Sequence, residues 1–225
     1  MASIKNIQLL AERLKLSTLR AGGIDLSNEQ QDHLEFLERI LQQEVNARDA
    51  ADYERRRIKS HIPIKKFLRE LAKGSVGWQI DSLQQLQWIR DEQNVVIVGK
   101  CNTGKTSLAA YLGMLALDQE MCVIYCTAEE FLTMVKRKDT SDKYKRQFSY
   151  IGSCSLVIID DLMYASMAME DLRLLYHGLM FINEGRSIML ITNRELSTWL
   201  ETTEDKHLME TMIDRITGNS QILRL

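Results

Sequence analysis

The sequence predicts an α/β fold, in which a parallel sheet carries helices on both faces and follows a small helical domain. After residue 74, short unbroken apolar runs alternate with amphipathic stretches. That alternation is typical of parallel strands that are buried on both sides and joined by crossover helices. Roughly the first 75 residues show only a helical spacing of apolar positions. The 225 residues, 45% of them hydrophobic, are enough for one domain and a smaller one.

The N-terminal region, residues 1–73, is predicted to be mainly helical. Ser27 is followed three residues later by Gln30, which has the form of a capping box and would start a helix. The apolar positions of that helix share one face: they are Leu34, Leu37, Leu41 and Val45. We therefore expect one long amphipathic helix in this region.

The long helix should end near Pro63, the only proline in the chain. Proline lacks an amide hydrogen and restricts the residue before it. Gly74 and Gly77 then predict a loosely structured connection. We place the domain boundary here, between a domain of residues 1–73 and a domain of residues 74–225.

The second domain contains five predicted strands, separated by four predicted helices. The strands are Val95–Val98, Cys122–Cys126, Leu156–Ile159, Ile188–Ile191 and Ile222–Leu225. The helices are Lys105–Leu117, Ala128–Arg137, Glu170–Asn183 and Glu204–Ile216. In open parallel sheets, ligands bind outside the carboxyl ends of the strands. Functional residues should therefore follow each apolar run.

A glycine-rich loop follows the first predicted strand and matches the pattern G-x-x-x-x-G-K-[ST]. Its glycines let successive amides face a phosphate, and the next helix adds its positive end. Lys105 would bridge the β- and γ-phosphates of ATP, and the Thr106 hydroxyl would hold Mg²⁺. The candidate nucleotide-binding residues are Gly99, Lys100, Cys101, Asn102, Thr103, Gly104, Lys105, Thr106 and Ser107.

Two aspartates end the third apolar run, where a second magnesium ligand is needed. Asp160 would coordinate Mg²⁺, largely through water, and Asp161 could orient the attacking water. Adjacent aspartates can also simply mark the end of a strand and a turn. Following a phosphate-binding loop, the catalytic interpretation is favoured.

Two further polar residues are candidates for the catalytic site. Asn193 follows the fourth run and could hydrogen-bond both the attacking water and the γ-phosphate, although asparagine is also a common turn former. Arg215 lies late in the last predicted helix and could reach the ATP of a neighbouring subunit as an arginine finger. The alternative for Arg215 is an exposed cation that stabilises the end of its helix.

The charge is unevenly distributed, although the net charge is only −2. Residues 53–73 hold eight basic and two acidic side chains, a local charge of +6. Such a segment is typical of a contact with the phosphates of duplex DNA, and the alternative is a solvated helix face with salt bridges. The DNA-binding candidates are Arg55, Arg56, Arg57, Lys59, Lys65 and Lys66.

A second basic cluster follows the predicted helix at Ala128. Its members are Lys136, Arg137, Lys138, Lys143, Lys145 and Arg146. In an oligomer these side chains could contact DNA phosphates. Asp139 and Asp142 interrupt the cluster, so a solvated loop is an equal alternative.

Together these motifs resemble the AAA+ ATPases of the helicase-loader branch, and within it the IstB-type transposition helpers. The resemblance rests on Gly99 to Thr106, Leu156 to Asp161, Thr192 to Arg194, the tryptophan at position 199 and Arg215. It implies an AAA+ core whose subunits oligomerise on duplex DNA with ATP and then recruit and stimulate a transposase. DnaC- and DnaI-type loaders, which are near relatives, imply instead a replicative helicase as the partner.

The chain departs from the usual pattern of that family at two places. Lys100, Cys101 and Asn102 replace the prolines and the middle glycine of G-P-P-G-T-G-K-T. Asparagine tolerates left-handed backbone angles, so the loop should still close. Asp161 stands where glutamate is more usual, which could slow hydrolysis. After Arg215 the chain has room for one strand and no helical lid, an arrangement similar to IstB-type proteins.

Three other functions remain open from the sequence: a helicase loader, a P-loop kinase of a small metabolite, and an adaptor that binds nucleotide without hydrolysing it. The basic N-terminal segment argues against the kinase. The first 15 residues contain Lys5, Glu12, Arg13 and Lys15 and so lack the apolar core of a signal peptide. No run reaches the ~18 apolar residues of a membrane span. We expect a cytoplasmic protein without a membrane partner.

Overall fold

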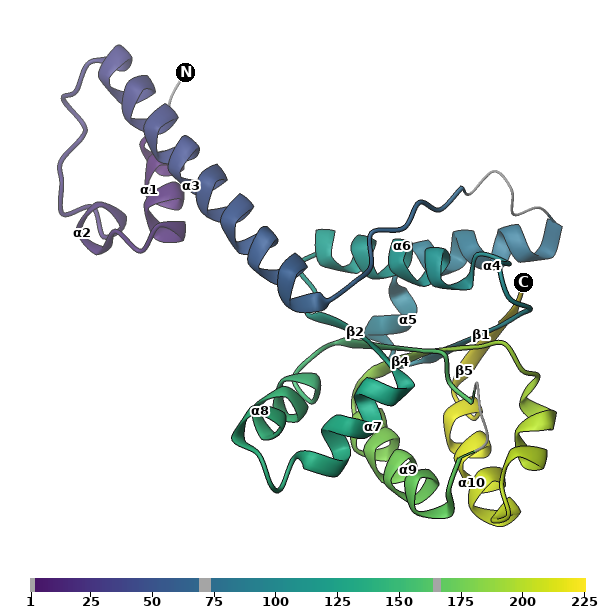
Figure 1. The fold of residues 1–225 in the computed structure, drawn as a ribbon. Helices are drawn as coiled ribbons and strands as arrows, with labels where there is room; N and C mark the ends of the chain where they lie inside the picture. The colour runs from purple at the N-terminus through teal and green to yellow at the C-terminus, as the bar shows by residue number, and fades with distance from the viewer. Residues whose placement is uncertain (1–2, 69–73, 164–166) are drawn as a thin grey trace. The chain divides into compact units, whose positions relative to one another are not determined.

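The computed structural model describes residues 3–68, 74–163 and 167–225. The chain divides into two compact units, Met1–Arg55 and Arg56–Leu225. Figure 1 shows the elements of each unit. Across the described ranges, no helix has both the length and the apolar character that crossing a membrane requires.

The first unit is helical, as predicted. It contains α1 (Ile4–Arg13), α2 (Ser17–Arg20) and most of α3 (Gln31–Ser60). Its small core joins these helices: the buried residues are Ile7, Leu10, Ala11, Leu14, Leu19, Leu34, Leu41 and Val45. At the edge of this core, the Arg13 guanidinium donates to both carboxylate oxygens of Asp49, at 2.7 and 3.0 Å.

The predicted capping box at Ser27 is wrong. The Ser27 amide and hydroxyl both donate to the Asp25 carboxylate, at 2.9 and 2.6 Å. This short-range turn uses the side chain that would otherwise cap a helix. Helix α3 begins only at Gln31. It ends at Ser60, before Pro63, as the sequence predicts.

The second unit is built on a five-stranded parallel sheet, which confirms the predicted fold class. The strands are β1 (Asn94–Val98), β2 (Val123–Thr127), β3 (Leu156–Asp160), β4 (Ser187–Thr192) and β5 (Ser220–Arg224). Their order across the sheet is β2-β3-β4-β1-β5. Val98 therefore pairs with Thr192, and Thr127 with Asp160, at one edge of the sheet. The residues that follow these strands are brought to the same edge.

Helices cover both faces of the sheet (Figure 1). One face carries α4 (Gly74–Gln84), α5 (Gln87–Arg90) and α6 (Lys105–Asp118). The other face carries the α-helices α7 (Ala128–Arg137), α8 (Asp142–Ile151), α9 (Met169–Asn183) and α10 (Lys206–Thr217), with the 3₁₀-helix η2 (Leu196–Thr202).

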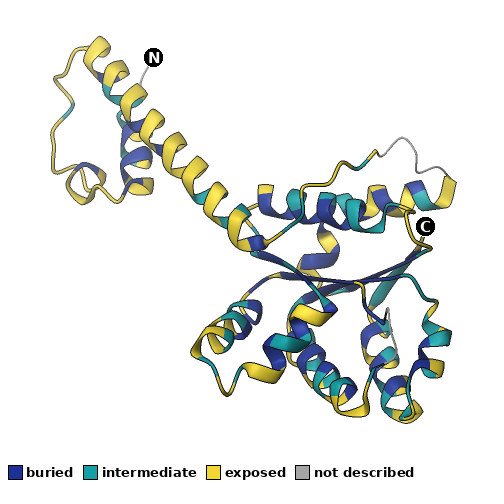
Figure 2. Ribbon diagram, viewed as in Figure 1, coloured by how far each residue is buried: buried dark blue, intermediate teal, exposed yellow. Residues whose placement is uncertain are grey.

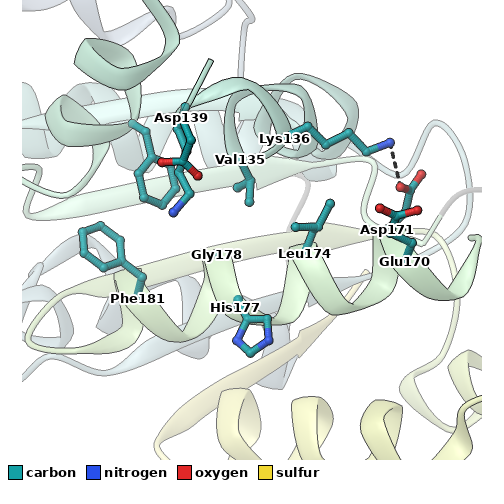
Figure 3. A pocket seen from close by; sticks show the side chains of 11 residues that line it. Val135, Lys136, Asp139, Glu170, Asp171, Leu174, His177, Gly178 and Phe181 are labelled. Atoms are coloured by element: carbon teal, nitrogen blue, oxygen red, sulfur yellow. Dashed lines mark ion pairs between the residues drawn. The ribbon is translucent and has the colours of Figure 1, made fainter. Parts of the chain in front are cut away.

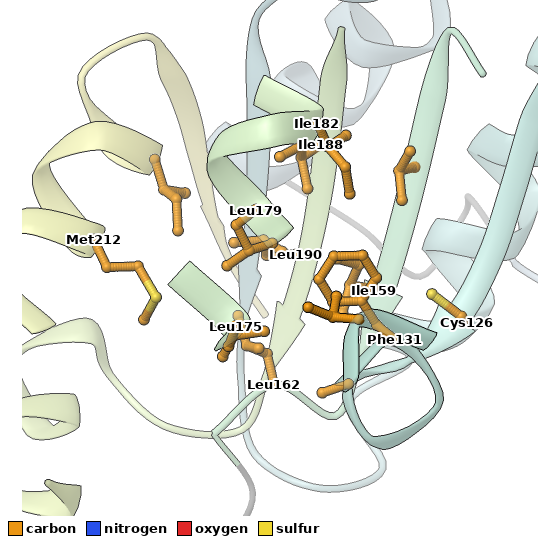
Figure 4. Close-up of a cluster of buried hydrophobic side chains, with 14 of the residues drawn as sticks. Cys126, Phe131, Ile159, Leu162, Leu175, Leu179, Ile182, Ile188, Leu190 and Met212 are labelled. Carbon is orange, nitrogen blue, oxygen red and sulfur yellow. The ribbon is translucent and has the colours of Figure 1, made fainter. Parts of the chain in front are cut away.

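The main core lies between the sheet and the helices α7, α9 and α10. Buried residues line both the sheet and the inner sides of the helices, while the outer sides are exposed (Figure 2). In Figure 4, Leu175 and Leu179 of α9 lie against Leu190 of β4, and Phe131 of α7 lies beside Ile159 of β3. All five of these side chains are fully buried, which is the reason the strands read as unbroken apolar runs.

The division into units falls inside α3, whereas the sequence places the domain boundary between residues 73 and 74. The physical reason is packing on α6 by the chain that follows Arg55. The Ile62 Cδ1 atom lies 3.0 Å from a Cβ built on Gly113, and the ring of Phe67 stacks on Tyr111 at 5.2 Å. Residues 69–73, next to the predicted boundary, lie outside the described ranges, so a functional boundary there stays a prediction.

The expected loose connection is wrong at Gly77, which lies inside α4, whereas Gly74 is the first residue of that helix and has a left-handed φ of +63°. Gly77, Ile80 and Leu83 are buried in that helix. Burial of this face outweighs the low helix propensity of Gly77, which is about 1 kcal/mol relative to alanine.

Gly178 sets the distance between α7 and α9. A Cβ at this position would lie 2.8 Å from Val135 Cγ2 and 2.9 Å from Phe131 Cζ. Glycine in a helix normally costs about 1 kcal/mol relative to alanine. Here the close approach of the two helices requires it.

We expect Gly178→Ala to lower the free energy of unfolding by about 1 to 2 kcal/mol, because overpacking outweighs the gain in helix propensity. Urea denaturation followed by circular dichroism measures the change. Arg173→Ala, at an exposed position of the same helix, should change stability by less than about 0.5 kcal/mol. A Gly178→Ala protein that is more stable than wild type would contradict this packing argument.

Candidate functional site

The loop between β1 and α6 adopts backbone angles that favour its glycine and asparagine. Asn102 has φ +64° and Gly104 has φ +91°, both in the left-handed region. The expectation that Asn102 can replace a more flexible residue is therefore confirmed. Within the described part of the chain, the amides of residues 101–104 donate no hydrogen bond to another backbone group. They are available to an anion in the concave loop.

Side chains of the loop turn back onto its own backbone. The Lys105 ammonium donates to the carbonyl of Lys100 at 2.8 Å, and the Thr103 hydroxyl donates to the same carbonyl at 3.0 Å. Gly99 allows this closure, because a Cβ there would lie 2.9 Å from the Thr103 hydroxyl oxygen, and 2.6 Å from the carbonyl oxygen of Leu225 beside the loop. Lys105 is thereby held at the mouth of the loop, where a phosphate would sit.

Asp160 is the centre of the site, and its carboxylate receives three hydrogen bonds. The Thr106 hydroxyl donates to Oδ2 at 2.7 Å, and the Tyr125 hydroxyl donates to the same oxygen at 2.6 Å. The Asp161 amide donates to Oδ1 at 2.7 Å. Asp160 is only 4% exposed, so these donors replace the water that a carboxylate would otherwise bind.

The sheet order explains why Thr106 meets Asp160. Strand β4 separates β1 from β3, and α6 crosses this gap in contact with both β3 and β4. The first turn of α6 therefore reaches the carboxyl end of β3. A hydroxyl and a carboxylate are oxygen ligands of the kind that Mg²⁺ prefers. The two predicted magnesium ligands thus form a donor set that fits this ion.

Asp161 follows Asp160 in a left-handed conformation, with φ +57°. Partial burial raises the pKa of the Asp161 carboxyl, and the neighbouring Asp160 charge raises it further. The Lys105 ammonium opposes that rise in pKa. The structure therefore places the Asp161 carboxyl in the field of both Asp160 and Lys105.

Asn193 lies on the other side of the loop, directly after β4. Its Nδ2 atom is 3.9 Å from the Cys101 sulfur, and its Oδ1 atom is buried without a hydrogen-bond partner among the described residues. A buried amide oxygen without a partner is costly and calls for an explanation. A bound water or phosphate hydroxyl at this position would supply the missing donor.

Sequence reasoning missed Tyr125, whose hydroxyl shares the Asp160 oxygen with Thr106. Tyr125 lies in β2, opposite Ile158 of β3, and its side chain reaches toward the carboxyl end of the sheet. Burial raises the pKa of Tyr125, and the hydrogen bond to Asp160 adds to that rise. The available signal was a single phenol in an otherwise apolar strand, which does not reveal where its hydroxyl points.

Arg215 and Trp199 do not join this group. Arg215 is exposed in the last turn of α10, and within the described ranges no hydrogen bond or ion pair links it to the loop or to Asp160. Trp199 is fully buried in the main core. The tryptophan is therefore a packing residue in this structure.

The predicted DNA-binding residues have different surroundings. Arg55 forms an ion pair with Asp52, and Lys59 lies 5.9 Å from the ring centre of Tyr150. The Arg56 Nε atom is buried and has no hydrogen-bond partner among the described residues. Arg57 is half-buried, whereas Lys65 and Lys66 are exposed. The last two basic residues of the segment, at positions 69 and 73, lie outside the described residues.

Most of the second basic cluster lies on α7 and α8, with Lys138 just after α7, so the part from residue 142 onward is helix and not a loop. Lys136 forms an ion pair with Asp171 of α9 at 2.6 Å (Figure 3). Lys138 lies 5.1 Å from the ring centre of Phe148. The cavity between α7 and α9 shown in Figure 3 holds about 780 Å³ and mixes acidic, basic and aromatic side chains. Part of the cluster is thus neutralised within the protein.

Several known proteins share this fold. The DnaC helicase loader is 14% identical with a TM-score of 0.57, and the match covers 74% of this chain and 96% of that chain. DnaI is 12% identical with a TM-score of 0.58, covering 71% of this chain and 95% of that chain. AMPPCP-bound DnaA from Aquifex aeolicus is 20% identical with a TM-score of 0.57, and the match covers 73% of this chain and 51% of that chain. These matches show that this chain shares the fold of those proteins.

Proteins that are similar in sequence identify the family of this chain more narrowly than the shared fold does. An IS21-like insertion-sequence ATP-binding protein of Bacteroides fragilis is 31% identical over 100% of this chain and 90% of its own length. The IS21 ATP-binding protein of Pseudomonas aeruginosa is 26% identical over 97% of this chain and 86% of its own length. The sequence profile described as IstB-like ATP binding protein matches residues 9–225. The chain therefore belongs to the IstB-like family of ATP-binding proteins, as its motifs suggested.

Proposed function

We propose that this protein binds ATP with Mg²⁺ at the loop of residues 99–106, hydrolyses it, and oligomerises with ATP on duplex DNA to recruit and stimulate a transposase. One observation carries the proposal: in a chain of the IstB-like family, the Thr106 hydroxyl meets the Asp160 carboxylate at 2.7 Å beside a closed phosphate-binding loop. The relatives named above as insertion-sequence ATP-binding proteins support ATP as the nucleotide.

Different residues of the loop would contact different parts of the nucleotide. The amides of residues 101–104 face the β-phosphate, and Lys105 leaves the Lys100 carbonyl to contact the β- and γ-phosphates. Thr106 and, through water, Asp160 would hold Mg²⁺, which neutralises charge on the phosphates. Gly99 and Ser107 frame the loop at its two ends.

Hydrolysis requires a water aligned with the γ-phosphate. Asp161 accepts a proton from this water and orients it, while the unpartnered Oδ1 of Asn193 accepts its second hydrogen. The water oxygen then bonds to the γ-phosphorus, the bond to the bridging oxygen breaks, and ADP and phosphate leave. Arg215, exposed on α10, would stabilise the leaving charge in a neighbouring subunit.

DNA binding would rest on phosphate contacts by the basic segment of residues 53–73. Lys65 and Lys66 flank Phe67, which stacks on Tyr111 of α6 at 5.2 Å. Their side chains are exposed and held close to the helix that begins at Lys105. Phosphate contacts of this kind predict binding that tolerates any sequence and falls steeply with salt.

Loading of a replicative helicase is the second candidate function. It is favoured by the match to the DnaC helicase loader, which extends over 96% of that protein. Pull-down against a transposase and against a replicative helicase separates the two functions. Capture of the helicase alone would reverse our choice of partner.

We expect Lys105→Ala to weaken ATP binding by about 10- to 100-fold, because hydrogen bonds to charged groups are worth about 1.5 to 3 kcal/mol. Fluorescence titration with a labelled ATP analogue and Mg²⁺ measures this change. Lys206→Ala, which removes an exposed ammonium at the start of α10, is the matched control and should bind normally. Equal affinity of the Lys105→Ala protein would remove the loop as the nucleotide site.

We expect Asp161→Asn to preserve ATP-dependent assembly and to slow turnover by about 10²- to 10⁴-fold, because an amide cannot accept the proton. Phosphate release with DNA present, alongside light scattering of the assemblies, measures both effects. Asp118→Asn, at the exposed end of α6, serves as the control. Normal turnover in the Asp161→Asn protein would exclude this residue from the mechanism.

We expect replacement of both Lys65 and Lys66 by alanine to weaken binding to random duplex DNA and to flatten its salt dependence by about 2 in the log–log slope. Fluorescence anisotropy across a salt series gives the slope. The control replaces Arg173 and Lys206, which are exposed elsewhere and carry the same total charge. An unchanged slope would show that these two lysines do not contact phosphates.

A further inference from the structure

The Asp160 carboxylate has a donor from β2 that no motif accounts for. The Tyr125 hydroxyl lies 2.6 Å from Oδ2, slightly closer than the Thr106 hydroxyl at 2.7 Å. The third donor, the Asp161 amide, holds Oδ1 at 2.7 Å. Donors from three segments therefore fix the rotation of one carboxylate that is 4% exposed.

Tyr125 is the donor and Asp160 the acceptor of the hydrogen bond between them. The Tyr125 hydroxyl donates to Asp160 Oδ2 at 2.6 Å. An ionised carboxylate can only accept hydrogen bonds, so the phenol hydroxyl is the donor. A hydrogen bond to an ionised acceptor is shorter and about twice as strong as one between neutral groups, which agrees with the 2.6 Å separation.

Thr106 and Tyr125 differ in whether their hydroxyl groups have a second partner besides Asp160. In the proposed ATP site, the Thr106 oxygen has a second task as a magnesium ligand. The Tyr125 hydroxyl comes from the opposite side, on the edge strand β2, and bonds to Asp160 alone among the described residues. It can hold the carboxylate in one orientation whether or not Thr106 has turned to a metal ion.

We propose that Tyr125 is a positioning residue, which orients the Asp160 carboxylate for magnesium and so sets the magnesium affinity of the ATP site. This inference rests on the proposed function, because it assigns Asp160 to the metal. Partners of this kind, which bond to a ligand and not to the metal, typically change metal affinity by about 10- to 100-fold when they are removed. Without the phenol, Asp160 retains a neighbour on each oxygen but loses one of two restraints on Oδ2.

The test compares wild type, Tyr125→Phe and Tyr150→Phe in magnesium titrations of a fluorescent ATP analogue, and repeats the nucleotide titration in EDTA. Tyr150 is the matched control: it lines the same cavity of about 770 Å³ as Tyr125, but its hydroxyl bonds to Cys122. Phenylalanine keeps the ring at either position. Thermal unfolding of each variant checks that the fold is intact.

We expect Tyr125→Phe to raise the half-saturating magnesium concentration by about 10-fold, with unchanged nucleotide affinity in EDTA. Excess magnesium should restore kcat close to the wild-type value, since Asp161 and Asn193 are untouched. Tyr150→Phe should match wild type throughout. A merely structural role for Tyr125 would instead lower nucleotide affinity in EDTA as well.

Two results would overturn the inference while leaving the proposed function intact. One is a Tyr125→Phe magnesium midpoint equal to that of wild type. The other is an equal loss of nucleotide affinity with and without magnesium. If wild type itself bound ATP with no magnesium dependence, the assignment of Thr106 and Asp160 to the metal would fail, and the inference would fail with it.

Discussion

Burial of a charged carboxylate at the end of a sheet strand is the constraint on which the rest of the site depends. All five residues of β3 are buried, and the last of them is Asp160. A buried carboxylate without donors would cost several kcal/mol. The structure meets this cost with donors from α6, from β2 and from the chain that follows β3. These bonds also fix the start of α6, and with it the phosphate-binding loop, against the sheet.

Several residues with left-handed backbone angles follow β1 and β3, at the end of the sheet where Asp160 lies. Asn102 and Gly104 adopt them in the loop after β1, and Asp161 and Met163 adopt them in the chain after β3. For residues other than glycine, this conformation costs roughly 1 to 2 kcal/mol. Clusters of such residues are found where a site needs a fixed geometry that surrounding packing can hold. Here the hydrogen bond from the Leu162 amide to the Ile191 carbonyl, at 2.9 Å, anchors the segment after β3 to β4.

The link between the basic segment and the nucleotide site runs through α6. The chain after Arg55 packs on this helix through Ile62 and Phe67. The same helix begins with Lys105 and Thr106, which lie at the loop and at Asp160. One helix therefore contacts both the chain after Arg55 and the Asp160 carboxylate.

The sheet, its crossover helices and the loop could be predicted from the sequence, because buried parallel strands and phosphate-binding loops require local residue patterns. Helix α7 falls where it was expected, from Ala128 to Arg137. Three features are evident only in the tertiary structure: Ser27 bonds to Asp25, Gly77 lies inside a helix, and residues 56–68 pack on α6. It alone brought Tyr125 to Asp160, across 35 residues of chain. Such contacts depend on the order of the strands and on how far side chains extend. Neither feature produces a periodic pattern of residues in the sequence.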